Sequence, residues 1–591
     1  MRRSHRRLRP ILCLLLVLMP ALAQAAMKVQ VQGLPDDLKA VVVNSLSASQ
    51  YTGRDVSAAQ ARRLYERAPG QVQSALRPYG YFEAHVDGDL KQTGDKDWTI
   101  TLKVDAGEPV KVTDIDIQMD KRARHLPAVC QAIHNFSPGK GAVLNQSQYT
   151  ASRETISSAL TATGFLDAKL TEHKVLVTRA NHSAVVHLHW KVGKRYRFGK
   201  VSFEGSQFKD GFLQRYVPFK RGDYFDQDQL LELQQALIGA DYFAVVNVNP
   251  DVQDAHGGVV NVDVQLKPAK RSVYTGGPFI GTDTGAGIRL GLERRWVNDR
   301  GHKWKNELVA AQRLKTLSTQ YTIPLPGVNA RALNFGANFR DANTDTSKSR
   351  TLELVGNETR QWHGWLRTVG VHALSGTFTV GKKGGETDNT LGVERGTSTL
   401  VYPEVSLQKK HGANPNFVRH GWSISLTARS TAGTLLSDTR FSQLLADAKW
   451  IDAFTARNRL ILHGSAGTTW VGDFSQLPPQ LRFFGGGDRS VRGYGYQSLG
   501  PSNRYDRVIG GRNLLVGGAT VEHYFTKAWG IAAFVDAGNA FNGTDFRPAV
   551  GAGLGVRWRS PVGMIRVDLG TPIHNSREHG IQLHLVIGPD L

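Results

Sequence analysis

The sequence predicts an α+β chain of three repeated β-α-α-β-β modules, followed by a 16-stranded antiparallel transmembrane β-barrel. Three observations support this prediction. A secretory signal opens the chain, a tripeptide recurs about every 80 residues as far as Lys267, and period-two alternation fills the remainder. We expect the signal peptide over 1–25, the modules over 27–107, 108–194 and 195–268, and the barrel over 269–591.

The first element is an export signal. Five arginines precede an apolar run from Ile11 to Leu18, and alanines that suit a cleavage site follow it. The run is about eight residues long, whereas a membrane-spanning helix needs about twenty. Cleavage after Ala23 or Ala25 would leave Cys130 as the sole thiol, which excludes an intramolecular disulfide in the mature chain.

The net charge of +22 suggests nucleic acid as a possible ligand. The lysines and arginines are scattered, however, without forming a basic tract, and five of them belong to the predicted signal. We therefore expect no nucleic acid among the partners. The charge fits a solvated surface that faces anionic lipid headgroups.

Each module is predicted from a motif that joins a helix to a strand. The three copies are Gly80-Tyr81-Phe82, Gly164-Phe165-Leu166 and Asp241-Tyr242-Phe243. The helix before each copy begins with a polar residue and a glutamine three positions later, a pair that satisfies free backbone donors. These pairs are Ser57 with Gln60, Asn145 with Gln148, and Asp226 with Gln229. One short strand opens each copy and two alternating strands close it, an arrangement that resembles the POTRA domain.

Past Lys270 the pattern changes to segments of about ten residues that alternate in polarity. Ala552, Leu554, Val556 and Trp558 share one face, opposite Gly551, Gly553, Gly555 and Arg557; likewise Ile565, Val567 and Leu569 oppose Arg566 and Asp568, and Leu583 and Leu585 oppose Gln582 and His584. Apolar residues facing lipid and polar residues facing a wet lumen are typical of a membrane barrel. A soluble β-sandwich would also alternate, but the export signal favours the barrel.

Sixteen strands fit between Arg271 and Leu591, with long extracellular connections after odd strands and short periplasmic turns after even ones. The expected long connections are Asp341–Lys348, Gly381–Gly396, Ser475–Gly511 and Thr571–Gly580. Short turns are expected at Pro324–Gly327 and Ser560–Gly563. Tryptophans near the strand ends fit an interfacial girdle.

The longest loop, between the eleventh and twelfth strands, contains Val491-Arg492-Gly493-Tyr494. Its glycines could suggest a phosphate cradle, but no helix follows them. A later strand reads Phe534-Val535-Asp536-Ala537-Gly538. Together these motifs resemble the VRG[FY] and FxDxG signatures of the BamA superfamily of outer-membrane insertases and polypeptide transporters. The resemblance implies that Arg492 docks on carboxylates of the barrel wall, which here match Glu522 and Asp536.

Three modules on a sixteen-stranded barrel resemble the TamA family within this superfamily. The resemblance implies a cell outer-membrane protein of a Gram-negative bacterium, with periplasmic modules, that assists insertion or secretion of autotransporters and other outer-membrane proteins. It implies contact with outer-membrane lipid, with client proteins and, through the first module, with a TamB-like inner-membrane-anchored partner. A two-partner-secretion-type export pore remains the alternative.

We expect no enzyme, cofactor or metal site. His187 and His189 share a strand face but no third ligand is evident, and no loop is long enough to hold an enzymatic domain.

The first and last barrel strands predict a weak lateral seam. Gly276, Gly277 and Pro278 interrupt the first strand, and Gly588 and Pro589 end the last one. Proline removes a backbone donor from the strand ladder. An alternative is that these glycines only permit curvature.

Overall fold

The structure is a computed structural model that describes residues 27–52, 54–94, 97–209, 211–253, 255, 257–326, 331–384, 386, 389–414, 417–560, 563–574, 580–588 and 590. The predicted signal peptide and Pro589 lie outside these residues. Two compact units are present: Met1–Gly199 with Arg221–Asp228 and Val252–Val260, and Lys200–Lys220 with Gln229–Asp251 and Asn261–Leu591. No helix in the described ranges combines the length and apolar character that a membrane span requires.

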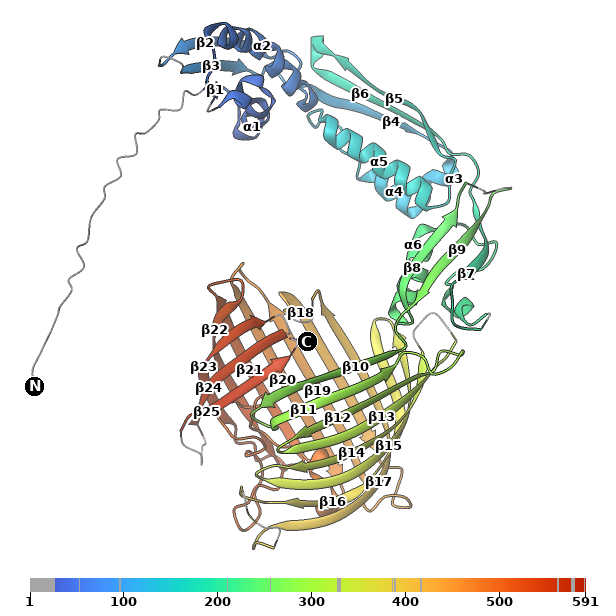
Figure 1. The fold of residues 1–591 in the computed structure, drawn as a ribbon, viewed down its shortest axis with the longest axis vertical. Coiled ribbons are helices and arrows are strands. Elements are labelled where there is room, and N and C mark those ends of the chain that lie inside the picture. Colours follow the sequence, from blue (N-terminus) through green and yellow to red (C-terminus); the bar gives the residue numbers. More distant parts are fainter. Residues whose placement is uncertain are drawn as a thin grey trace, which may run out of the picture. The chain divides into compact units, whose positions relative to one another are not determined.

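The first module is a helix pair on a three-stranded sheet (Figure 1). Its elements are β1 (Met27–Gln32), α1 (Asp36–Ser45), η1 (Ser47–Tyr51), α2 (Ala58–Leu76), η2 (Arg77–Tyr79), β2 (His85–Gln92) and β3 (Trp98–Asp105). The sheet order is β1-β3-β2, with β1 parallel and β2 antiparallel to β3. At the start of α2 the Gln60 N–H donates to the Ser57 hydroxyl at 3.3 Å, so the predicted cap forms.

The second module repeats this topology with the order β4-β6-β5. It consists of β4 (Lys111–Gln118), α3 (Lys121–Arg124), α4 (Pro127–His134), α5 (Gln146–Ala162), β5 (Lys169–Thr178), η3 (Arg179–Asn181) and β6 (Ser183–Lys191). The Asn145 side chain caps α5 by accepting from the Ser147 and Gln148 N–H groups. His187 and His189 lie on the solvent side of β6, and Cys130 is exposed on α4.

The third module has the order β7-β9-β8 and differs in its first helix. Its elements are β7 (Arg197–Glu204), η4 (Leu213–Tyr216), α6 (Gln227–Gly239), β8 (Phe243–Asp251) and β9 (Val259–Pro268). A single 3₁₀ turn, η4, stands where the repeat predicts an α-helix. The turn ends at Val217, which is extended, as expected for the residue before Pro218.

The first residue of each recurring tripeptide has a left-handed backbone conformation. Gly80, Gly164 and Asp241 have φ values of 91°, 98° and 57°. The Gly80 carbonyl accepts a hydrogen bond from the Val110 N–H, and the Gly164 carbonyl accepts one from the Tyr196 N–H. In each case the donor lies at the start of the next module. In the third copy the Tyr242 hydroxyl donates to the Gly301 carbonyl at 2.6 Å, so this copy joins the third module to the barrel within one compact unit.

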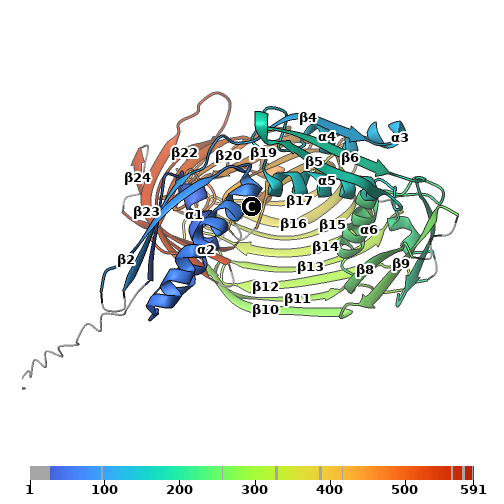
Figure 2. The ribbon, with the colours of Figure 1, turned by 90° about the horizontal axis from the view of Figure 1, so that it is seen from above.

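Sixteen antiparallel strands form the barrel in sequence order. They are β10 (Ser272–Gly281), β11 (Gly285–Arg294), β12 (Lys303–Ala311), β13 (Leu314–Pro324), β14 (Ala332–Asn343), β15 (Ser347–Trp362), β16 (Trp365–Val380), β17 (Glu394–Gly412), β18 (His420–Ser430), β19 (Phe441–Asp452), β20 (Asn458–Val471), β21 (Asn513–Tyr524), β22 (Trp529–Phe541), β23 (Ala549–Ser560), β24 (Gly563–His574) and β25 (Gln582–Gly588). Figure 2 shows β10 to β17 following one another as an arc. The predicted strand number and order are therefore confirmed.

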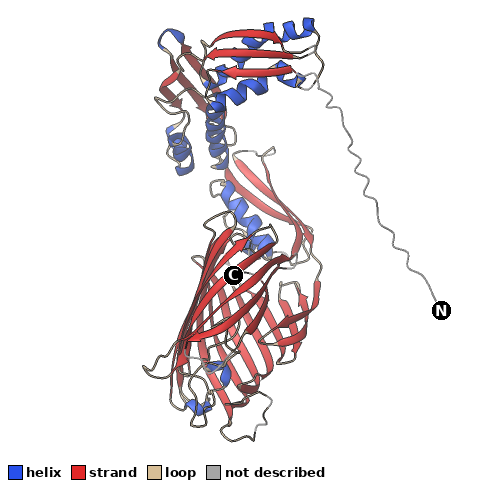
Figure 3. Ribbon diagram, turned by 90° about the vertical axis from the view of Figure 1, so that its left-hand side faces the viewer, coloured by secondary structure: helices blue, strands red, loops and turns tan. Residues whose placement is uncertain are grey.

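The strand order gives the connections the predicted parity, and the connection after β14 is shorter than expected. Parts of the expected connections Pro324–Gly327, Ser560–Gly563 and Thr571–Gly580 lie outside the described residues. Most of Asp341–Lys348 belongs to β14 and β15, which leaves a turn of residues 344–346 where a longer loop was expected. Asp341, Ala342 and Asn343 pair with Arg350, Ser349 and Lys348, so the two strands extend past the predicted ends. The long connection between β20 and β21 carries two short 3₁₀ turns, η5 (Phe474–Gln476) and η6 (Pro479–Leu481), which Figure 3 shows among the barrel strands.

The two faces of the barrel strands differ as the alternation predicts. On β23, Leu554 is 69% exposed, whereas Arg557 is only 1% exposed. Several tryptophans near strand ends are also exposed, among them Trp304, Trp362, Trp470 and Trp529. The apolar face therefore points to lipid and the charged face to the lumen.

The barrel has an unsealed seam, which we define as the junction of β10 and β25. The described strands form one continuous sheet from β10 to β25, but no ladder joins these two edges to each other. In Figure 1 the last strands, in red, reach the first barrel strands, in green. Across the seam the Leu585 N–H donates to the Thr282 hydroxyl at 3.3 Å.

Candidate functional site

The loop between β20 and β21 enters the lumen and is held there by Arg492. The Arg492 Nε lies 2.7 Å from Asp536 Oδ2 on β22, and its Nη1 lies 2.9 Å from Asp568 Oδ2 on β24. Its Nη2 donates to the Thr520 hydroxyl at 2.8 Å. The guanidinium also stacks over Phe534, 3.7 Å from the ring centroid. Since Asp536 is fully buried, this charge pair is shielded from water.

The second expected partner of Arg492 is corrected by the structure. Glu522 bonds Arg459 and Arg557 at 2.5 and 2.7 Å and accepts the Tyr524 hydroxyl at 3.0 Å. These three donors occupy its two oxygens, so Asp568 takes the place that was predicted for Glu522. Glu522 still belongs to the same assembly, because Arg557 also bonds Asp568 at 2.6 Å.

We call this assembly the luminal ion chain. It alternates in sign and runs, in order of contact, through Asp536, Arg492, Asp568, Arg557, Glu522, Arg459 and Asp590, with Arg566 also bound to Asp590. Its four arginines and four carboxylates balance in charge. Buried charges persist only when they are paired, so each member depends on the others.

Glycines on the inner wall make room for the docked loop. A Cβ at Gly551 would lie 1.9 Å from the Arg492 carbonyl oxygen, and one at Gly518 would lie 2.1 Å from Asp536 Oδ1. A Cβ at Gly555 would lie 1.8 Å from Asp568 Oδ1. These inward-facing glycines therefore serve close approach of the loop and the ion chain to the wall.

The same loop also joins the two edges of the seam. The Thr282 hydroxyl, one residue past β10, donates to Asp488 of the loop at 2.6 Å. His584 Nδ1 of β25 lies 2.7 Å from the same carboxylate, and the Gly493 N–H donates to His584 Nε2 at 2.9 Å. The ring proton is thereby assigned to Nδ1. We call Thr282, Asp488, His584 and Gly493 the seam clasp.

The other motif residues hold the loop close to β23 and β24. Val491 and Tyr494 are buried together with Val516 and Ala549. The Tyr494 hydroxyl donates to the His574 carbonyl at 2.7 Å. Gly493 has a φ of 95° and packs against the Thr571 backbone, a position that only glycine adopts without strain.

The predicted seam residues that the structure describes lie on the two edge strands, but they do not form the contact across the seam. Gly276, Gly277 and Pro278 are exposed and pair only toward β11, opposite Leu290, Arg289 and Ile288. Gly588 ends β25 opposite Met564 of β24, and Pro589 lies outside the described part of the chain. The contact across the seam is formed instead near Gly281 and Thr282, at the opposite end of β10 from Ser272.

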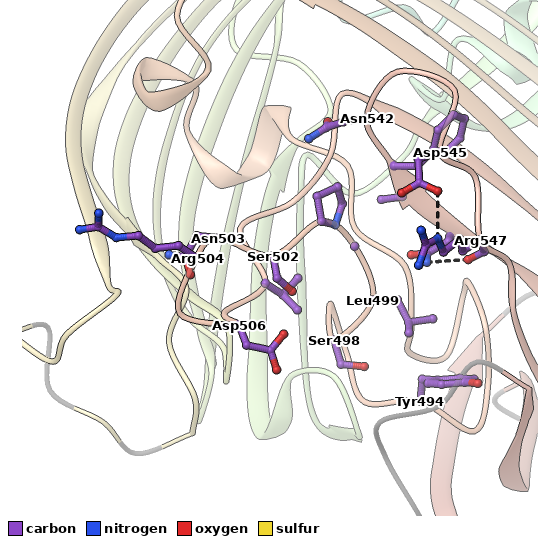
Figure 4. A pocket seen from close by; sticks show the side chains of 16 residues that line it. Tyr494, Ser498, Leu499, Ser502, Asn503, Arg504, Asp506, Asn542, Asp545 and Arg547 are labelled. Atoms are coloured by element: carbon purple, nitrogen blue, oxygen red, sulfur yellow. Dashed lines mark hydrogen bonds and ion pairs between the residues drawn. The ribbon is translucent and has the colours of Figure 1, made fainter.

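A cavity of about 1000 Å³ lies on another part of the loop (Figure 4). It is lined by loop residues from Tyr494 to Val508, by the end of β22 and by the connection from β22 to β23. Asp545 and Arg547 pair at its rim at 2.9 Å, and both are mostly exposed. The described residues place no member of the luminal ion chain on its lining.

Several residues of the site were not among the predicted ones. Arg557, Arg566, Asp568 and His584 stood at inward positions of the predicted alternation, so charge at luminal parity was an available signal. Asp488 and Asp590 lie outside regular strands, where no periodicity marks a direction. Among the described residues, no group of three metal-ligating side chains comes together.

Comparison with known proteins gives three family matches. The model of the Omp85 superfamily domain matches residues 297–589. The model of POTRA domain TamA domain 1 matches residues 28–106, and a POTRA model described as surface antigen variable number repeat matches residues 196–269.

Solved structures show a related fold. BamA from Haemophilus ducreyi, in a structure lacking POTRA domains 1–3, matches with a TM-score of 0.64 at 16% identity, covering 80% of this chain and 98% of that one. CdiB from Acinetobacter baumannii gives a TM-score of 0.46 at 15% identity, covering 80% of this chain and 88% of its own. At these identities the likeness concerns the fold alone, and only the first match supports it.

Proposed function

Because this chain belongs to the Omp85 superfamily, with a first POTRA domain of the TamA type, we propose that it assists insertion and secretion of autotransporters and other outer-membrane proteins through the seam between β10 and β25. The superfamily comprises outer-membrane barrels for protein transport and assembly and is not a family of enzymes. The barrel lies in the outer membrane and the POTRA domains lie in the periplasm.

The unsealed seam is the observation on which the proposal depends. An unpaired backbone group that faces hydrocarbon costs several kcal/mol. A client strand could satisfy the free edges of β10 and β25 by strand addition, which uses main-chain hydrogen bonds and tolerates many sequences. Pro278 limits the ladder that β10 could form with β25, since it lacks an N–H donor.

The docked loop favours a lateral route over a route through the pore. Arg492 ties the loop to two wall strands, and the luminal ion chain continues to Asp590. A polypeptide passing along the lumen would have to break several buried ion pairs, each costing about 3 to 5 kcal/mol when one partner is left behind. A strand inserted at the seam breaks the seam clasp and the Asp590 pairs at the end of the luminal ion chain, but it leaves the Arg492 anchor of the loop in place.

The direct experiment is assembly in proteoliposomes. The purified chain should accelerate folding of an autotransporter barrel, measured by heat-modifiable gel mobility, relative to liposomes that contain an unrelated barrel. Planar-bilayer conductance distinguishes this function from that of an export pore. An export pore should give a large steady conductance, whereas an assembly barrel should be nearly closed. A large steady conductance without faster client folding would overturn the proposal.

We further propose that the first module binds a TamB-like inner-membrane-anchored protein. Its β1 and β2 are the edges of a three-stranded sheet, and edges of this kind accept an added strand. Deletion of residues 27–107 should abolish co-purification of the partner while the barrel still inserts. Retained co-purification would place the contact elsewhere.

A further inference from the structure

The Asp590 carboxylate is surrounded by hydrogen-bond donors inside the barrel. The Arg459 Nη1 and Nη2 atoms lie 2.6 and 3.3 Å from its two oxygens, and the Val418 N–H donates to it at 2.8 Å. Arg566 also bonds it, and Lys449 Nζ donates to its backbone carbonyl at 2.6 Å. The carboxylate is fully buried, as is Arg459. These donors come from β19, β20, β24 and the turn before β18.

Asp590 is directly coupled to the seam. It follows Gly588, the end of β25, by two residues, and two residues of extended chain reach about 7 Å. β25 therefore cannot move far from its place while Asp590 stays bound. Displacement of β25 during function would withdraw Asp590 from the two arginines.

The site left behind would be cationic. Without Asp590 the luminal ion chain holds four arginines, Arg459, Arg492, Arg557 and Arg566, against three carboxylates, Glu522, Asp536 and Asp568. A buried unpaired charge is strongly unfavourable, so another anion must replace Asp590 or β25 must return.

A neighbouring cavity offers access for such an anion. It has a volume of about 460 Å³ and is bounded by β25 itself at residues 586–588. Its lining carries Lys410, Lys449, Arg489, Arg492, Arg557 and Arg566 against four carboxylates. Asp536 and Asp590 pair with Arg492 and Arg566 from behind the lining and offset this excess. The cavity therefore becomes complementary to an anionic ligand when Asp590 leaves.

We propose that Arg459, Arg566 and the Val418 amide form a receptor site for a peptide carboxylate, which Asp590 fills while the seam is closed and a client segment fills when β25 is displaced. The planar guanidinium of Arg459 meets both oxygens of its present occupant, a geometry that selects carboxylate. The inference rests on the proposed lateral function, since that function supplies the displacement of β25.

The test is peptide binding to the full chain in detergent, with Asp590→Ala as the variant and Asp545→Ala, at an exposed loop, as its matched control. The probe is a fluorescent nine-residue peptide of alternating apolar and polar residues with a free C-terminal carboxylate. Because Asp590→Ala lacks the carboxylate that competes for the site, it should bind the peptide about tenfold more tightly, or more, than wild type. The control variant should keep the wild-type affinity. Adding Arg566→Gln should abolish the gain.

Two further peptides identify the source of the carboxylate. The same peptide with an amidated C-terminus should bind Asp590→Ala no more tightly than wild type. An amidated peptide with one internal aspartate should bind Asp590→Ala more tightly only if the site accepts side-chain carboxylates. Equal affinity of wild type and Asp590→Ala for the free acid, or an equal gain for acid and fully amidated peptides, would overturn the proposal.

Folding is controlled separately. If Asp590→Ala folds poorly, acetate should restore its folded yield relative to chloride of equal ionic strength, and no rescue by acetate would count against the site. The outcome is also separable from the lateral route. If Asp590→Ala gains affinity but clients still assemble when the seam is crosslinked, the carboxylate site is retained and the lateral route is rejected. If Asp590→Ala gains no affinity but crosslinking the seam stops assembly, the lateral route is retained and the site is rejected.

Discussion

Thr282 and His584, on the two free edges of the barrel sheet, share one carboxylate, that of Asp488. The Thr282 hydroxyl donates to it at 2.6 Å and His584 Nδ1 lies 2.7 Å from it. Asp488 and Arg492 belong to the same loop, so the group that closes the seam and the group that anchors the loop are four residues apart. Loop docking and seam closure are therefore expected to respond together.

Asp488→Ala should loosen the seam while the barrel remains folded. The change removes two hydrogen bonds, each worth about 1 kcal/mol, so backbone exchange in β25 should speed up about fivefold or more. Hydrogen–deuterium exchange of peptides that cover residues 582–588 measures the effect. Asp545→Ala, at an exposed aspartate of the connection between β22 and β23, should leave that exchange unchanged. Equal exchange in both variants would show that the clasp does not hold β25.

Arg492→Ala should release the loop from the lumen. The substitution leaves Asp536 and Asp568 without their shared cation, at a cost of about 3 to 5 kcal/mol. We expect cleavage by proteinase K within residues 472–512 and reduced client assembly. Arg504→Ala, at an exposed arginine of the same loop, is the matched control. A protease-resistant loop with wild-type assembly would contradict the docking role.

Gly551→Ala should disturb docking without removing any charge. Its Cβ would meet the Arg492 carbonyl oxygen at 1.9 Å, and backbone atoms on both sides would have to shift. A Cβ at Gly517, by contrast, would find its nearest atom at 3.6 Å. We therefore predict protease sensitivity of the loop in Gly551→Ala and resistance in Gly517→Ala. Resistance in both would mean that the wall does not set the position of the loop.

Asp283, in the turn after β10, should make stability depend on pH. Burial and the nearby Asp488 charge raise the pKa of Asp283 to about 6, although Arg489 and His584 oppose this and Tyr496 also faces it. A carboxyl whose pKa is raised on folding contributes stability at low pH and loses it as pH rises from about 4 to about 6. The free energy of unfolding of Asp283→Asn, taken relative to wild type, should therefore rise by about 2 kcal/mol from pH 4 to pH 7.5.

The measurement is the thermal unfolding midpoint in detergent at both pH values, with Asp545→Asn as an exposed control. A constant difference between Asp283→Asn and wild type across this range would contradict the assignment.

Alternation was sufficient to predict the barrel, its strand order and its luminal face, because a membrane barrel exposes one side of every strand to lipid and the other to the lumen. Arg557 and Asp568 follow directly from that rule. The partner of Arg492 did not, since Glu522 and Asp568 both face inward and only the competing arginines, Arg459 and Arg557, decide between them.

The seam could be anticipated from Pro278 and its neighbouring glycines, but its contact point could not. Register between two strands far apart in sequence depends on barrel closure and on the clasp, neither of which leaves a local pattern. Asp590 illustrates the same limit, because its burial arises from donors on strands distant in sequence.

The central claim is that the seam must part during client assembly, and a reversible crosslink tests it most directly. In a Cys130→Ser background, Gly281→Cys with Leu585→Cys joins the two edges where they approach, since a Cβ at Gly281 lies 3.9 Å from the Leu585 carbonyl oxygen. Tyr274→Cys with Leu292→Cys, register partners on β10 and β11, is the matched control. Oxidation should stop client assembly by the seam pair alone, and reduction should restore it. Efficient crosslinking of the seam pair with undiminished assembly would contradict the account.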